Sequence, residues 1–172
     1  MIRAEDSPPF SIVRAGAERI DDLQSLWESL SEHHSEVAPE LAALGPRRSP
    51  ENSWRVRRAI YAELLTEPDA FVLLAEAGSR PIGYALVHIR GSQASWETGR
   101  VAELETLAVL PGDRGCGVGT ALVEAVFAQL RRLEIGHWAV GVIGSNAEAI
   151  RFYERLDLLP FMVTYIGGVP AG

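Results

Sequence analysis

The stretch Leu107-Ala-Val-Leu-Pro-Gly-Asp-Arg114-Gly-Cys-Gly117-Val-Gly119-Thr-Ala-Leu122 decides the fold. An apolar, β-branched strand runs into a loop with alternating glycines, and the loop opens directly into an amphipathic run that predicts a helix over 119–133. Glycines let the backbone approach a bulky anion, and the free N–H groups at a helix start point at it. The stretch therefore predicts a phosphate or pyrophosphate site, with a ligand-free glycine-rich turn as the alternative.

Other phosphate-binding folds fit this loop poorly. Thr120 stands where a dinucleotide-binding fingerprint has its third glycine, and Glu134 falls on the helix end instead of after a second parallel strand. All 16 basic residues are arginine. The absence of lysine excludes a Walker A loop, Schiff-base chemistry and a kinase built on a strand lysine.

A second element lies downstream, in Asn146-Ala-Glu-Ala-Ile-Arg-Phe-Tyr153. Asn146 suits the N-cap of a helix over 147–156, and Tyr153 lies two turns further on the same side. With Arg114, Gly117 and Gly119, this element resembles the GCN5-related N-acetyltransferase (GNAT) family. The resemblance extends from about Ser11 to Ile166 and implies an α/β fold, a GNAT-type acyl-CoA N-acyltransferase with a mixed central sheet flanked by helices.

The order of the remaining elements agrees with that fold class. The residue patterns predict a single domain over 10–167 between tails at 1–9 and 168–172. Asp157-Leu158 replaces the usual Gly-Phe of the family, and Asp tolerates the left-handed backbone of that turn. The predicted strands are 10–15, 70–77, 82–89, 100–110, 137–143 and 161–166, and the predicted helices are 17–30, 51–65, 119–133 and 147–156.

The resemblance implies that acetyl-CoA binds in a cleft between the parallel strands 100–110 and 137–143. Strand backbone would pair with the pantetheine arm, loop amides would hold the pyrophosphate, and no metal is implied. Cys116 would contribute its N–H and not its thiol. The implied cofactor-binding residues are Leu107, Ala108, Val109, Arg114, Gly115, Cys116, Gly117, Val118, Gly119, Thr120 and Asn146.

Acetyl transfer to a primary amine needs a base for the amine and an acid for the thiolate. Glu103 and Glu105 alternate along one strand, so we expect both on one side, together with Leu107 and Val109. Either carboxylate is a candidate base, with a solvated strand face as the alternative. Tyr153 is the candidate acid, with an aromatic ring packed on the sheet as the alternative.

The implied function is transfer of acetyl from acetyl-CoA to a small-molecule amine, including cationic ones, by direct attack in a ternary complex. A peptide or protein acetyltransferase, or a non-catalytic acyl-CoA sensor, are the alternatives. Acceptor recognition is expected from segment 31–50 and loop 91–99. His33, Glu36 and Trp96 are the candidate substrate residues. The alternatives are that His33 and His34 form a solvated pair on an exposed connector and that Trp96 belongs to the core.

Composition limits the partners and the compartment. The 172 residues carry a formal net charge of −7, which argues against nucleic-acid binding. One cysteine forms no internal disulfide, and the sequence offers neither a zinc framework nor an apolar run that would span a membrane. We therefore expect a cytoplasmic protein with no membrane contact, and a homodimer remains open.

Overall fold

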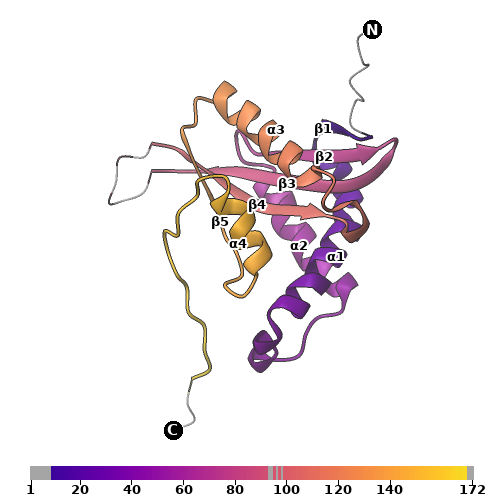
Figure 1. Cartoon of the computed structure of the whole chain (residues 1–172), viewed down its shortest axis with the longest axis vertical. Helices are drawn as coiled ribbons and strands as arrows, with labels where there is room; N and C mark the ends of the chain where they lie inside the picture. Colours follow the sequence, from indigo (N-terminus) through magenta and orange to yellow (C-terminus); the bar gives the residue numbers. More distant parts are fainter. Residues whose placement is uncertain (1–8, 93–94, 96, 98, 170–172) are drawn as a thin grey trace.

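The fold, given by a computed structural model, is described for residues 9–92, 95, 97 and 99–169. Its centre is one five-stranded sheet in the order β1-β2-β3-β4-β5 (Figure 1). Strands β1 to β4 pair antiparallel, and β5 pairs parallel to β4. The strands are β1 Ser11–Ala15, β2 Phe71–Ala77, β3 Arg80–Arg90, β4 Val101–Val109 and β5 His137–Val140.

Helices cover both faces of this sheet (Figure 1). The α1–α2 face carries α1 and α2, and the α3–α4 face carries α3 and α4, each with its own apolar cluster. Because both faces are covered, β2 and β3 are apolar on both sides. The helices are α1 Gln24–Val37, α2 Pro50–Leu64, α3 Val118–Arg132 and α4 Ala147–Glu154, with 3-10 turns η1 Ala17–Leu23, η2 Pro39–Leu44 and η3 Pro111–Asp113.

The pairing of β3 with β4 contains a β-bulge. Leu86 lies opposite Thr106, and the next residue, Val87, lies opposite Leu104. Glu105 is therefore the extra residue on β4, and a bulge of this kind breaks the in–out alternation of the strand. As a result Leu104 and Leu107, three residues apart, both contact the cluster of the α3–α4 face.

The first helical region differs from the sequence prediction. Residues 17–23 form a 3-10 turn, and α1 begins at Gln24 and continues to Val37. The spacing of Ile20, Leu23, Leu26 and Trp27 is kept, because all four side chains are buried. His33 and Glu36 were expected in a connector, and the structure places them in the last turns of α1 instead.

The C-terminal prediction is half right. Asp157 has a φ of 61°, so the expected left-handed turn after α4 is present. The strand predicted over 161–166 is wrong, since the described chain has no strand or helix after α4. Trp96 lies outside the described residues. Among those residues, no helix has the length and apolar character needed to cross a membrane.

Candidate functional site

Strands β4 and β5 run together for only part of their length. Their register begins at Val101 opposite His137 and ends at Leu104 opposite Val140. Beyond that point β4 continues to Val109, paired with β3, while the chain after β5 turns away into the loop before α4. The last half of β4 therefore presents a backbone edge where an extended ligand can add as a strand would.

The glycine loop follows directly at the end of that edge. Gly115 and Gly117 have φ values of 76° and 83°, and Gly117 is the N-cap of α3. The Ala121 N–H donates to the Gly117 carbonyl at 2.9 Å. Within the described part of the chain, the N–H groups of residues 115–120 have no acceptor. A row of unpaired N–H groups at a helix N-terminus fits a pyrophosphate.

The side chains of this loop play smaller parts. Arg114 Nε donates to the Val109 carbonyl at 3.1 Å, which ties the loop to the end of β4. Cys116 is exposed, whereas the Val118 side chain is buried in the α3–α4 cluster. Residues 115–120 would therefore bind an anion mainly through their backbone N–H groups, and the Arg114 guanidinium lies beside them.

Asn146 caps α4, as predicted. Its Oδ1 accepts a hydrogen bond from the Ala149 N–H at 3.1 Å, and the side chain is almost fully buried. The cap fixes where α4 begins, and thereby where Tyr153 lies two turns later. The contact of Asn146 with a cofactor arm stays a prediction.

Glu105 lies where β4 and β5 part, and its side chain is held from two sides. Arg57 Nη1, from α2, donates to Oε1 at 2.6 Å, while His88 Nε2, from β3, lies 3.9 Å from Oε2. His88 Nδ1 in turn lies 3.4 Å from Glu67 Oε2. Three titratable groups thus form a line from the strand junction to the more exposed Glu67.

This placement corrects one sequence expectation. Glu105 contacts α2, so it lies on the α1–α2 face, whereas Leu107 and Val109 contact the cluster of the α3–α4 face. The expectation that the carboxylates share a side with Leu107 and Val109 is therefore wrong. The bulge at Glu105 is the physical reason, because one extra residue moves all later side chains to the other face.

Glu103 has a different environment. It lies inside the paired part of β4, opposite Ala139 of β5 and His88 of β3. Its carboxylate pairs with the Arg90 guanidinium. Glu103 is therefore paired with Arg90 in the region where β4 and β5 still run together. Of the two candidate carboxylates, only Glu105 lies at the point where the strands separate.

Sequence reasoning missed the α2 residues around Glu105. The Arg57 guanidinium lies 4.2 Å from the Trp27 ring centroid, so it bridges an aromatic ring and the carboxylate. One turn later, the buried Tyr61 hydroxyl is 2.5 Å from Thr106 Oγ1, and burial raises the pKa of Tyr61 to about 12. The spacing of four between Arg57 and Tyr61 was the available signal, because it places both on one helix face.

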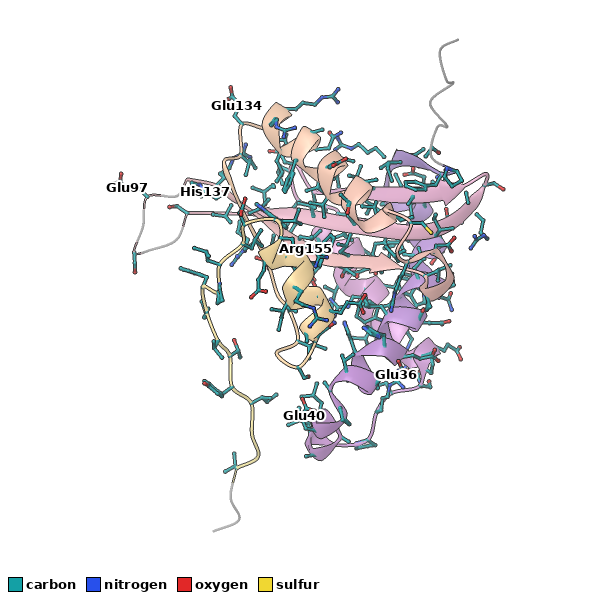
Figure 2. The ribbon with its side chains drawn as sticks, viewed as in Figure 1. Glu36, Glu40, Glu97, Glu134, His137 and Arg155 are labelled. Carbon is teal, nitrogen blue, oxygen red and sulfur yellow. The ribbon has the colours of Figure 1, made fainter. Side chains whose placement is uncertain are left out.

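The candidate acceptor residues His33 and Glu36 lie on α1, and their neighbour His34 contacts the Trp27 ring beside Arg57. His34 is half-buried beside Trp27, and burial, with smaller contributions from His33 and Arg57, lowers its pKa to about 4. His33 Nδ1 lies 3.8 Å from Glu36 Oε2. Figure 2 shows Glu36 and Glu40 together at one end of the helical layer. That end is linked to the loop before α4, because Ser145 Oγ donates to Glu40 Oε1 at 3.2 Å.

Tyr153 occupies the α3–α4 face. Its side chain is 9% exposed and its ring packs edge-on against Trp138 and Phe152. Burial raises the pKa of Tyr153 well above its usual range, so the hydroxyl keeps its proton at neutral pH. Tyr153 and Glu105 thus lie on opposite faces of the sheet, with Tyr153 beside Trp138 of β5 and Glu105 at the point where β4 and β5 separate.

Two cavities lie elsewhere on the surface. One of about 510 Å³ is lined by Asp21, Asp22, Glu28 and Leu110, among others. The second, of about 280 Å³, lies between the end of α3 and the start of β5. Neither lining contains Glu103, Glu105 or Tyr153. Within the described ranges, no three His, Cys, Asp or Glu side chains gather closely enough to hold a metal ion.

Comparison with known sequences gives a clear match. The profile of the acetyltransferase (GNAT) family matches residues 25–158. A Mycobacterium tuberculosis protein, uncharacterized N-acetyltransferase Rv2669, is 36% identical over 97 residues, which are 56% of this chain and 58% of that protein. The match therefore spans a little over half the length of the curated relative.

Solved structures share the fold across nearly the whole chain. The tetramutant of the BH1408 protein from Bacillus halodurans aligns with a TM-score of 0.76 at 17% identity, covering 92% of this chain and 99% of that chain. Aminoglycoside N-acetyltransferase AAC(6')-Iy in complex with CoA aligns with a TM-score of 0.66 at 16% identity, covering 99% and 100%. At such low identities the likeness concerns the fold.

Proposed function

This chain belongs to the acetyltransferase (GNAT) family, and from that premise we propose that it transfers an acetyl group from acetyl-CoA to a primary amine of a small molecule. One observation carries the proposal. The unpaired edge of β4 runs directly into the glycine loop, whose N–H groups at 115–120 have no acceptor within the described residues. A ligand with an extended arm that ends in a pyrophosphate fits this arrangement, because the arm can pair with the β4 edge while the pyrophosphate meets the loop N–H groups.

In this proposal, acetyl-CoA is bound mainly by backbone groups of the protein. The edge of β4 from Leu107 to Val109 pairs with the pantetheine arm, and the N–H groups from Gly115 to Thr120 bind the pyrophosphate. Bound acetyl-CoA supplies an activated acyl group. A backbone N–H near Val109 stabilises the developing oxyanion. A solved relative of the same fold, AAC(6')-Iy, binds CoA, which supports this assignment.

Glu105 is the proposed base. A primary amine has a pKa of about 10 and must lose a proton before it attacks. The Glu105 carboxylate lies at the strand junction, with one oxygen fixed by Arg57 and the other turned toward His88. Glu103 is already paired with Arg90 within the continuous part of the sheet. These contacts favour Glu105 over Glu103.

Tyr153 is the proposed acid for the departing thiolate. Its raised pKa keeps the phenol protonated, as a proton donor requires. It lies on the face opposite Glu105, beside Trp138 of β5, so base and acid come from opposite faces of the sheet. In direct attack the amine adds to the carbonyl carbon of the thioester and gives its proton to Glu105, and the tetrahedral intermediate then expels the thiolate, which takes the proton of the Tyr153 hydroxyl.

The acceptor is proposed to be a small amine that approaches from the α1–α2 face. That face presents Glu105 beside Glu67 and His88. Carboxylates attract ammonium groups. The net charge of −7 favours cationic acceptors in the same way. An aminoglycoside acetyltransferase with the same fold supports a small-molecule acceptor.

The proposal is tested by thiol release from acetyl-CoA in the presence of polyamines, aminoglycosides, amino acids and peptides. We expect release that depends on one class of small amine, with the acetylated amine detected by mass spectrometry. Release with peptides alone would favour the peptide acetyltransferase alternative. Binding of acetyl-CoA without release by any amine would favour the sensor alternative and contradict the proposed activity.

A further inference from the structure

His88 of β3 has a carboxylate beside each of its two ring nitrogens. Its Nε2 lies 3.9 Å from Oε2 of Glu105, and its Nδ1 lies 3.4 Å from Oε2 of Glu67. Arg57 donates to the other oxygen of Glu105, so Oε2 is the oxygen that faces the ring. An imidazole can take up a proton on one nitrogen and release a proton from the other. The ring therefore connects the proposed base with Glu67.

Glu67 lies in the turn between α2 and β2, where two backbone hydrogen bonds fix its position. Its N–H donates to the Leu64 carbonyl at 3.0 Å, and its carbonyl accepts from the Ala70 N–H at 3.3 Å. The Glu67 side chain is 41% exposed, against 14% for His88 and 25% for Glu105. The line of three groups thus reaches water at Glu67, while the ring in its middle is largely screened from water.

Acetylation of an ammonium group releases one proton to water in each turnover. The ammonium nitrogen starts with three hydrogens and the amide keeps one, while the CoA thiol takes one of the two that leave. The remaining proton arrives on Glu105, the proposed base, and must leave it before the next turnover. Arg57 cannot take this proton, because a guanidinium is already charged and has no acceptor.

We propose that His88 and Glu67 carry this proton from Glu105 to water, an inference that rests on the proposed function. Protonated Glu105 gives its proton to His88 Nε2, and the imidazole gives its Nδ1 proton to Glu67, which releases it to water. Rotation of the ring then exchanges the two nitrogens, so that the next proton again meets an unprotonated nitrogen. Over the cycle Glu105 returns to its carboxylate form, and the chain neither gains nor loses a proton.

The charges around His88 suit a ring that gains and loses a proton. Glu103 lies directly opposite His88 on β4, and an arginine already pairs with its carboxylate. Among the described residues Glu67 has no arginine partner, and His88 is the charged group beside it. The positive charge that the ring carries during transfer therefore meets a carboxylate that no arginine neutralises. The charged groups around the ring are Glu67, Glu103 with Arg90, and Glu105 with Arg57.

The first test is chemical rescue of His88→Ala in the full chain. Thiol release is measured with acetyl-CoA and the amine that the wild type acetylates fastest, with spermidine and kanamycin as the first probes. We expect kcat to fall by about 10-fold or more while the KM for the amine changes by less than about twofold, and added imidazole should restore most of the loss. A purely structural role of His88 predicts no rescue. His137→Ala, on β5 opposite Val101, is the matched control and should behave as the wild type with and without imidazole.

The second test is the pH dependence of the loss. A neutral amine brings no proton for release, so the ratio of wild-type kcat to His88→Ala kcat should shrink as the pH rises from 7 toward the amine pKa of about 10. Glu67→Gln should show the same trend with a smaller loss, because water can replace its exposed carboxylate. Glu63→Gln, an exposed carboxylate on α2, is the control for Glu67→Gln and should keep wild-type kcat.

Failure of the relay and failure of the proposed function give different results. If the wild type acetylates an amine and His88→Ala has the same kcat at neutral pH, the relay is wrong and the proposed function stands. A loss in His88→Ala that imidazole does not restore, or that stays constant with pH, overturns the relay in the same way. If the wild type acetylates no amine of the panel, the proposed function fails and the relay fails with it.

Discussion

The Arg57 guanidinium donates to Oε1 of Glu105 at 2.6 Å, and so joins α2 to the point where β4 and β5 part. The same guanidinium lies over the Trp27 ring, which limits where it can move. Arg57 therefore orients the carboxylate, leaving Oε2 directed to the His88 side. The proposed base is held by groups from a helix and a neighbouring strand.

Glu105→Gln should lower turnover by about 100-fold or more, because an amide cannot accept the proton of the amine. Glu103→Gln is the matched control on the same strand and should change turnover by less than about tenfold. Steady-state thiol release checks both. Equal losses in the two variants, or a larger loss in Glu103→Gln, would contradict the assignment of the base.

Tyr153→Phe should lower kcat by about 10- to 100-fold while acetyl-CoA affinity stays within about twofold of the wild type. The phenyl ring keeps the packing against Trp138 and Phe152, so thermal stability should change little. Steady-state kinetics with calorimetric titration of acetyl-CoA separates the two effects. Normal turnover in this variant would remove Tyr153 from the proposed mechanism.

Gly117→Ala should weaken acetyl-CoA binding. Gly117 has a φ of 83°, and a side chain there costs about 1–2 kcal/mol or moves the loop and its N–H groups. Gly112→Ala is a suitable control, because a Cβ there meets nothing within 4 Å and its φ is not positive. Calorimetric titration should show a loss for Gly117→Ala alone. Unchanged affinity in that variant would argue that the loop does not hold the pyrophosphate.

Acidification should destabilise the fold through His34. Its pKa falls from 6.5 to about 4 in the folded protein, mainly through burial, so below pH 6.5 the unfolded chain binds the proton more readily. The contribution of neutral His34 to the free energy of unfolding is fully present above pH 6.5 and is lost as the pH falls toward 4. The loss should be on the order of 1–2 kcal/mol, reduced by the water that still reaches the ring.

Urea unfolding of wild type and His34→Gln between pH 7.5 and 4 measures this effect. The pH dependence should be shallower in His34→Gln, since Arg57, His33 and Trp27 then surround a group that does not titrate. Parallel pH profiles for the two proteins would show that His34 does not cause the loss.

Local patterns in the sequence predicted most of the fold. The glycines before α3, the N-cap Asn146 and the left-handed Asp157 each specify a backbone conformation within a few residues, and the structure shows all three. The strand expected at 161–166, which the structure lacks, could not be judged from local residues in the same way. A strand needs a partner, and apolar, β-branched residues show only that the segment can pair. The sequence does not indicate where the partner lies.

The candidate site was predictable in its backbone and less so in its side chains. The bulge at Glu105 depends on the register of β4 against β3, which two distant segments set together. Simple alternation therefore placed Glu105 on the wrong side relative to Leu107. The contact with Arg57 joins residues 48 positions apart, so it follows from the packing of α2 on the sheet.

Amide hydrogen exchange with and without acetyl-CoA reports which backbone groups of the chain bind the cofactor. We expect slower exchange in two stretches on binding, the β4 edge from Glu105 to Val109 and the loop from Gly115 to Thr120. Exchange in β2, which is buried and distant from the loop in sequence, should stay the same. No protection in either stretch, or protection confined to the cavity lined by Asp21 and Glu28, would contradict it.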